Sequence, residues 1–232
     1  MKRKELPDLD LADFKLDDDF GERKPKFSDK LSGFSRGVFT AAKFILGLCL
    51  LPFVYSSTFA FFREFAGLSA ALQGYFRAGV ISFLVLYLFI WDAAFIYKRG
   101  HRLLEFLFSF IKPLVKVAPY LVPVYAVVIF LLYKFFGLWQ AGPRLDGYFM
   151  AGLGFSLSLH LVFSSRAIRS KKGDPLKANY IFAFSFVYLL NLLLLAAFLS
   201  ASFNEFSFIL FAGNSYQSAA AVFSAVFTQL FL

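Results

Sequence analysis

The stretch Ala178–Leu199, ANYIFAFSFVYLLNLLLLAAFL, contains no charged residue. Its length matches the roughly 20 apolar residues with which a helix crosses the hydrocarbon core of a bilayer. Lipid tolerates a helix that is apolar on every face, because the helix satisfies its own backbone hydrogen bonds. The stretch therefore predicts a transmembrane helix.

Similar apolar runs occur from Phe44 to the end of the chain. Hydrophobic residues make up 59% of the 232 residues, 35 of which are Phe, and this is more apolar surface than a soluble domain of that length can bury. The predicted fold class is therefore all-α, a polytopic integral membrane bundle of five or six transmembrane helices. The further candidate spans are Phe44–Phe62, Ala78–Tyr97, Val117–Tyr133, Gly147–Phe163 and a weaker one, Phe206–Leu232, with a predicted break near Gly213-Asn214-Ser215.

Three regions are expected along the chain. Residues 1–26 are polar and acidic, which predicts a disordered cytoplasmic tail or, because apolar residues punctuate the acids, a docking peptide. Residues 27–43 carry apolar positions at helical spacing among Lys and Arg, which is typical of an interfacial amphipathic helix. Residues 44–232 form the transmembrane bundle. No cleaved signal is expected, because the first long apolar run begins only at Phe44.

The charge distribution predicts the orientation. Of the 24 Lys and Arg residues, twenty lie before the first span or in the loops after the second and fourth spans; the four others are Arg63, Arg77, Lys134 and Arg144. The positive-inside rule then places the N-terminus and the two basic loops in the cytoplasm. Clusters at the ends of apolar runs favour contact with lipid headgroups over nucleic acid, which is not an expected partner. The expected headgroup contacts are Lys98, Arg99, Arg102, Arg166, Arg169, Lys171 and Lys172.

Three of the polar side chains inside the candidate spans suggest a particular role. An ionisable residue at membrane depth is costly and by default a functional hypothesis. Asp92 is a proton or ion ligand, a partner of a basic residue such as Lys98, or a structural hydrogen-bonding group. His160 is either a hydrogen-bonding residue between helices or part of a metal site. Asn191 is interpreted as an interhelical hydrogen-bonding residue.

One hexapeptide, Gly100-His101-Arg102-Leu103-Leu104-Glu105, resembles a damaged zinc-protease motif. In H-E-x-x-H, two histidines four residues apart grip one zinc ion, and the Glu acts as general base. Here Arg102 stands at the position of the base and cannot accept a proton. Glu105 stands at the second ligand position and can offer only a carboxylate.

The surroundings of this motif resemble bacterial membrane proteins related to the site-two protease class of intramembrane zinc metallopeptidases. The resemblance covers residues 81–200 and rests on short motifs in a shared order: Phe95-Ile96-Tyr97 before Gly100-His101, Ala118-Pro119-Tyr120-Leu121-Val122-Pro123-Val124-Tyr125, Gly154-Phe155-Ser156-Leu157-Ser158-Leu159-His160, Gly173-Asp174-Pro175 and Tyr188-Leu189-Leu190-Asn191. It implies a multi-pass protein of the bacterial inner membrane. It also implies a remnant metal site, with zinc as its metal, formed by His101, Glu105 and His160 or Asp174.

The departures from that family favour a protein without proteolytic activity. We expect no catalytic residue and no cofactor, and we interpret the chain as a pseudoenzyme that binds or scaffolds a membrane-protein partner within the lipid bilayer. This hypothesis predicts that the substitution His101→Ala is tolerated. The alternatives are an unorthodox membrane metalloenzyme that loses stoichiometric zinc on His101→Ala, a transport subunit centred on Asp92, and an accessory subunit whose acidic tail docks a soluble partner.

Overall fold

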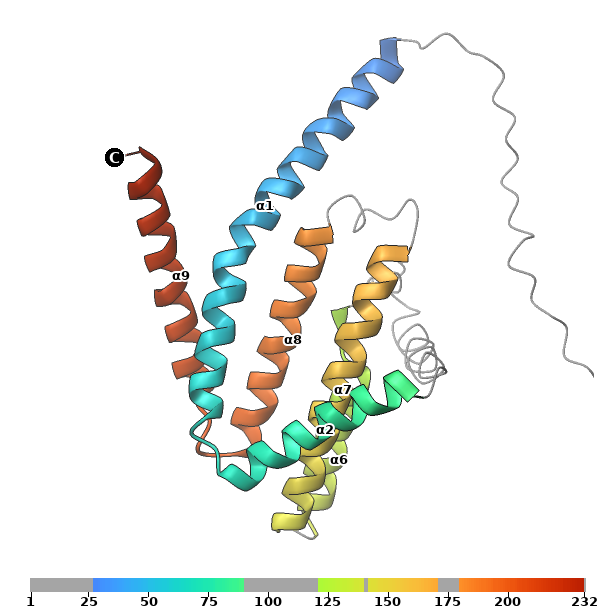
Figure 1. Cartoon of the computed structure of the whole chain (residues 1–232), viewed down its shortest axis with the longest axis vertical. Coiled ribbons are helices and arrows are strands. Elements are labelled where there is room, and N and C mark those ends of the chain that lie inside the picture. Colours follow the sequence, from blue (N-terminus) through green and yellow to red (C-terminus); the bar gives the residue numbers. More distant parts are fainter. Residues whose placement is uncertain (1–26, 90–120, 140–141, 171–179, 232) are drawn as a thin grey trace, which may run out of the picture. The chain divides into compact units, whose positions relative to one another are not determined.

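The computed structural model describes residues 27–89, 121–139, 142–170 and 180–231, and within these ranges every regular element is a helix (Figure 1). The helices are α1 (Phe27–Phe65), α2 (Ala70–Phe89), α6 (Val124–Gly137), α7 (Pro143–Ser170), α8 (Tyr180–Ser202) and α9 (Phe208–Phe231). The chain divides into two compact units, Met1–Phe39 and Thr40–Leu232. The contacts that hold α2, α6, α7, α8 and α9 together lie within the second unit.

Four of these helices are long and apolar enough to cross a membrane: Ala41–Phe65 within α1, α2, Pro143–Ile168 within α7, and α8. Helix α6 is apolar but has only 14 residues. Helix α9 has 24 residues and does not reach the same apolarity. The all-α membrane class is therefore confirmed for the described residues, whereas five or six crossings remain a prediction.

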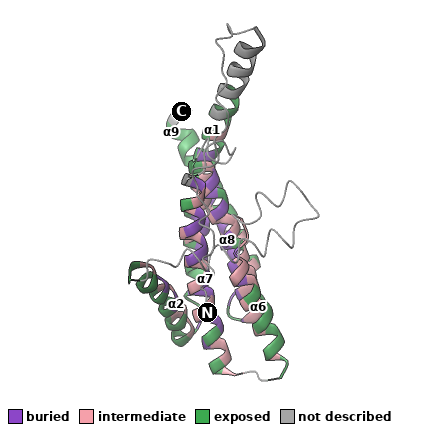
Figure 2. Ribbon diagram, turned by 90° about the vertical axis from the view of Figure 1, so that its right-hand side faces the viewer, coloured by how far each residue is buried: buried purple, intermediate pink, exposed green. Residues whose placement is uncertain are grey.

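Helices α7 and α8 carry most of the buried surface, as the purple segments in Figure 2 show. In α7, 56% of the apolar window is buried, compared with 11% in α2. Helix α7 is also the least apolar of the four candidate spans, with a mean hydropathy of 1.3 against 2.4 for α8. Burial in this bundle follows helix packing rather than hydropathy, as expected where lipid is as apolar as the side chains.

Small residues let α2 and α7 approach at backbone distance. Gly147, Ala151 and Gly154 share one face of α7, because spacings of four and three residues return to the same side of a helix. A Cβ atom at Gly79 of α2 would collide with the backbone carbonyl of Ala151, and one at Gly154 would collide with the carbonyl oxygen of Phe76. Close backbone approach at small residues is a common means of helix association in membranes.

Aromatic rings join the other helices. The Phe61 ring of α1 lies 5.7 Å from the ring of Phe206 and 6.3 Å from that of Phe211 at the start of α9. The Tyr133 ring of α6 stacks on Phe149 of α7 at 4.1 Å between centroids. All of these rings belong to, or pack against, one hydrophobic cluster, which gains its stability from shape-complementary contacts.

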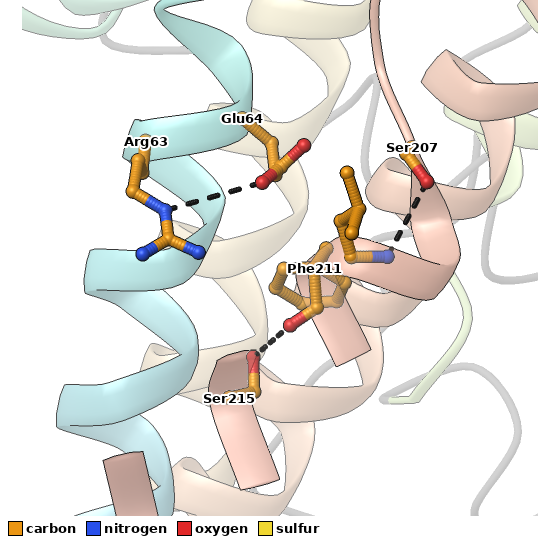
Figure 3. A network of polar contacts seen from close by, with 6 residues as sticks. Arg63, Glu64, Ser207, Phe211 and Ser215 are labelled. Carbon is orange, nitrogen blue, oxygen red and sulfur yellow. Dashed lines mark hydrogen bonds and ion pairs between the residues drawn. The ribbon is translucent and has the colours of Figure 1, made fainter. Parts of the chain in front are cut away.

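The turn between α8 and α9 is closed by serine hydroxyls. The backbone N–H of Phe208 donates to Ser200 Oγ at 3.2 Å. Ser207 Oγ accepts from the N–H of Leu210 at 3.3 Å as the N-cap of α9 (Figure 3). Helix α9 then runs without interruption to Phe231. The break expected near Gly213 is wrong: Ser215 Oγ donates back to the Phe211 carbonyl at 2.7 Å, and this local bond lets the polar residue sit inside a continuous helix.

Candidate functional site

Asn191 connects α8 to a helix break beside it. Pro123 precedes α6 with φ −78° and ψ 82°, outside the helical region, so the helix is interrupted between Leu121 and Val124. Asn191 Nδ2 donates to the Leu121 carbonyl at 3.1 Å and to the Val187 carbonyl of its own helix at 2.7 Å. The bond to Leu121 is the contact between segments that was expected of this residue.

The other half of the Asn191 amide is unusual. The side chain is 1% exposed, and its Oδ1 has no hydrogen-bond partner among the described residues. A buried acceptor without a donor costs about 1–3 kcal/mol. Asn191 is therefore a polar group at membrane depth whose donors are used in the fold and whose acceptor is not.

His160 is buried in α7, with 4% of its surface exposed. Its Nε2 lies 3.2 Å from Ser164 Oγ, one turn later in the same helix, and it has further interactions in the structure. Because α7 continues to Ser170, His160 lies deeper within its helix than the predicted span Gly147–Phe163 implied. Among residues 27–89, 121–139, 142–170 and 180–231, no group of three or more His, Cys, Asp or Glu side chains is placed to hold a metal ion.

Most of the predicted site residues lie outside the described part of the chain. These are Asp92, Lys98, Arg99, His101, Arg102, Glu105, Lys171, Lys172 and Asp174. The remnant metal site of His101, Glu105 and His160 or Asp174 therefore stays a prediction. Arg169 belongs to α7, but its side chain is not described.

Arg166 has a contact that the sequence did not predict. Its guanidinium lies over the ring of Tyr87 in α2, with 4.9 Å from Cζ to the ring centroid. The Tyr87 ring in turn contacts Phe83 and Phe163 at 5.7 and 6.0 Å. Arg166 is exposed, so stacking on Tyr87 is compatible with the expected contact to lipid headgroups.

A cavity of ≈410 Å³ lies between α1, α8 and α9. We call it the apolar groove; its lining residues are Leu50, Phe53, Ser57, Phe186, Leu189, Leu190, Leu193, Phe211, Ala212, Ser215 and Tyr216. Ser215 is the buried end of the polar contacts in Figure 3, and its hydroxyl is taken up by the Phe211 carbonyl. The groove therefore offers shape and apolar contact rather than hydrogen bonds.

Sequence reasoning missed both this groove and the role of Lys134. The Lys134 ammonium donates to the carbonyl of Ala201 at the end of α8 and lies 5.7 and 5.6 Å from the ring centroids of Phe130 and Tyr133. A cation at the C-terminal end of a helix is favourable because the free carbonyls there carry partial negative charge. The position of Lys134 in the last turn of α6 was a signal that it caps helix carbonyls. The sequence does not indicate, however, which helix Lys134 reaches.

Comparison of the chain with protein-family models, with curated proteins and with solved structures gives no match. The resemblance to intramembrane metallopeptidases therefore rests on the sequence motifs alone.

The helix break at Leu121 should respond to Asn191→Leu. The substitution removes the hydrogen bond to the Leu121 carbonyl but also removes the unpartnered Oδ1, so the two effects oppose each other and we expect the total unfolding free energy to change by less than about 1 kcal/mol. Detergent-titrated unfolding measures this, and hydrogen exchange should rise first in the initial turns of α6. Ser185→Ala, a buried polar residue of α8 for which no hydrogen bond is described, is the matched control. Equal hydrogen exchange at the start of α6 in the two variants would contradict the assignment.

Proposed function

We propose that this chain is a multi-pass protein of the bacterial inner membrane, with its N-terminus in the cytoplasm, that binds or scaffolds a membrane-protein partner. The fold it uses is proposed to derive from an intramembrane metallopeptidase whose catalytic motif has degenerated. Arg102 in place of the general base supports the loss of peptide hydrolysis by the usual mechanism. The distribution of Lys and Arg supports the orientation.

The observation that carries the binding role is the apolar groove. Its floor and walls come from α1, α8 and α9, two of which contain candidate membrane spans. Three of its lining residues, Ser57, Ala212 and Ser215, are small, and small residues let another helix approach closely in lipid.

The proposed occupant is an apolar transmembrane segment of the partner, which places large side chains between α1 and α9. Such a segment makes closer dispersion contacts with the groove than lipid chains do, because lipid chains are mobile. The Ser215 hydroxyl does not require a polar ligand, because it is satisfied within its own helix. Recognition is then by shape, and variants that change the volume of the groove should change binding.

A photo-reactive benzoylphenylalanine at Leu193, which lines the groove and is 42% exposed, tests this proposal in cells. We expect a discrete protein adduct from Leu193 and none from Leu84, an equally exposed position of α2 outside the groove. Filling the groove with Ala212→Phe should abolish the adduct, because the partner side chains then lose their space. Gly213→Phe adds the same ring where nothing lies within 4 Å, and it should leave the adduct intact.

Two outcomes would contradict the proposal. Equal protein adducts from Leu193 and Leu84 would show contact without specificity. Adducts to phospholipid alone at Leu193, unchanged by Ala212→Phe, would show that lipid rather than a protein segment fills the groove.

A further inference from the structure

A second cavity, of ≈720 Å³, lies where α6 ends and α7 begins. Its lining combines one cation, Arg144, with the aromatic rings of Phe136, Trp139 and Tyr148. The backbone fixes this arrangement on both sides: the N–H of Trp139 donates to the Phe136 carbonyl at 3.0 Å, and Leu145 N–H donates to the Gly142 carbonyl at 3.0 Å. We call this cavity the Arg144 pocket.

The position of the Arg144 pocket matches the headgroup level of a bilayer. The candidate span of α7 begins at Pro143, so the pocket lies at the end of a helix that is apolar enough to cross the membrane. Trp139 and Tyr148 are 78% and 76% exposed, and Trp and Tyr gather at membrane interfaces, where one part of each ring system is apolar and another is wet. Rings this exposed are unfavourable in water, but they are well placed against lipid.

Arg144 is available for a ligand. The described residues offer it no hydrogen bond or ion pair, and it is exposed. The neighbouring carboxylate of Asp146 is engaged elsewhere, since it accepts a hydrogen bond from the Tyr133 hydroxyl at 2.9 Å. The other cation of this helix end, Lys134, reaches the carbonyl of Ala201. Arg144 is therefore the charged group that defines what the pocket attracts.

We infer that the Arg144 pocket binds the phosphate of a glycerophospholipid from the leaflet opposite the basic loops. The planar guanidinium matches a phosphate with two parallel hydrogen bonds. The rings of Phe136, Trp139 and Tyr148 then contact the glycerol and the first methylenes of the acyl chains. A free phosphate ion would gain only the contact with Arg144 and leave the aromatic surface unused. This site lies on α6 and α7 and does not depend on the apolar groove or on the function proposed above.

Trp139 makes the binding visible. The chain has two Trp residues, Trp91 and Trp139, so the full-length protein carrying Trp91→Phe reports emission from Trp139 alone. The detergent-solubilised protein is titrated with dihexanoylphosphatidylglycerol, with dihexanoylglycerol, which lacks the phosphate, and with inorganic phosphate. We expect a saturable change of emission with the phospholipid only.

The charge is tested by Arg144→Gln in the same background, which should weaken phospholipid binding by roughly tenfold, as expected for the loss of a charge-assisted hydrogen bond. Arg77→Gln is the matched control, an exposed cation of α2 that bonds Gln73 Oε1 at 3.0 Å outside the pocket, and should leave binding within about twofold. Because Arg144 makes no hydrogen bond or ion pair with the described residues, Arg144→Gln should leave the unfolding midpoint unchanged. Arg144→Lys keeps the charge without the planar fork, and should bind with intermediate affinity.

Three results would overturn the inference. Equal binding of dihexanoylglycerol would show that the phosphate is not recognised, and an equal effect of inorganic phosphate would show a site for a free anion. Equal weakening by Arg144→Gln and Arg77→Gln would show general attraction between charges rather than binding in the pocket.

Discussion

Replacing Gly79 with Ala should separate α2 from α7. The added Cβ would meet the carbonyl oxygen, carbonyl carbon and Cα of Ala151, all of them backbone atoms that cannot rotate away. Overpacking of this kind costs about 1–3 kcal/mol even where flexible side chains absorb part of it, and here the backbone of a 28-residue helix would have to shift. We expect a loss at the upper end of that range, measured by detergent-titrated unfolding.

Gly74→Ala is the matched control, because Gly74 lies in the same helix and nothing stands within 4 Å of where its Cβ would be. Both substitutions reduce the freedom of the unfolded chain equally, so their difference isolates the clash. Gly74→Ala should be neutral or should stabilise α2 by up to about 1 kcal/mol. Two variants of equal stability would show that α2 and α7 do not pack at backbone distance.

The contact between α2 and α7 can also be tested from α7. Gly154→Ala should also destabilise, since its Cβ would meet the carbonyl of Phe76. The double substitution Gly79→Ala with Gly154→Ala should cost less than the sum of the two single losses, because helices already forced apart have room for the second Cβ. Additive losses would mean that the two glycines lie in separate contacts.

The sequence predicted where most apolar helices run but not where each begins. Helix α8, Tyr180–Ser202, lies close to its predicted span Ala178–Leu199, because that run is apolar throughout. Helix α2 begins at Ala70, eight residues before the predicted start at Ala78. The cause is Gln73 and Arg77, which lower the hydropathy there and yet belong to the helix. The N–H of Gln73 donates to the Ser69 carbonyl at 3.1 Å, and its Nε2 donates to the Leu68 carbonyl of the preceding turn at 2.8 Å.

Local chemistry also explains why one helix is interrupted and another continues. Pro123, which has no N–H, lies between the helical residue Leu121 and the start of α6 at Val124, and it therefore interrupts the predicted span Val117–Tyr133. Near Gly213 the opposite happens: a cluster of Gly, Asn and Ser suggested a break, but the Ser215 hydroxyl bonds within α9 and the helix continues. Composition alone does not distinguish a polar residue that ends a helix from one that bonds back to it.

The candidate sites were harder to predict than the helices. Asn191 could be singled out because an amide in an otherwise apolar run needs a partner, but that its partner is Leu121, seventy positions away, follows only from tertiary packing. The apolar groove combines residues of α1, α8 and α9 that are ordinary members of apolar runs. Its existence depends on how far three helices diverge, and hydrophobic periodicity contains no information on that distance.

Phe61→Ala is the second substitution that we expect to reduce stability strongly, and it should loosen α9 in particular. The Phe61 side chain is 3% exposed and lies among the rings of Phe65, Phe206 and Phe211 at 5.6, 5.7 and 6.3 Å. Truncation of a buried Phe costs about 3–5 kcal/mol, through lost contacts and the cavity that remains. Detergent-titrated unfolding measures the total loss.

Hydrogen exchange locates the same effect. Phe206 and Phe211 flank the first turn of α9, so losing the Phe61 ring should raise exchange in α9 before it does so in α7 or α8, which bury more of their own surface. Phe59→Ala removes an identical ring that is 62% exposed on the same helix, and should change stability by less than about 1 kcal/mol. If Phe59→Ala were as costly as Phe61→Ala, or if exchange rose uniformly, the aromatic cluster would not be what holds α9. If α9 is loosened specifically, Phe61→Ala should also weaken the binding of a partner in the apolar groove, because α9 forms one of the walls of the groove.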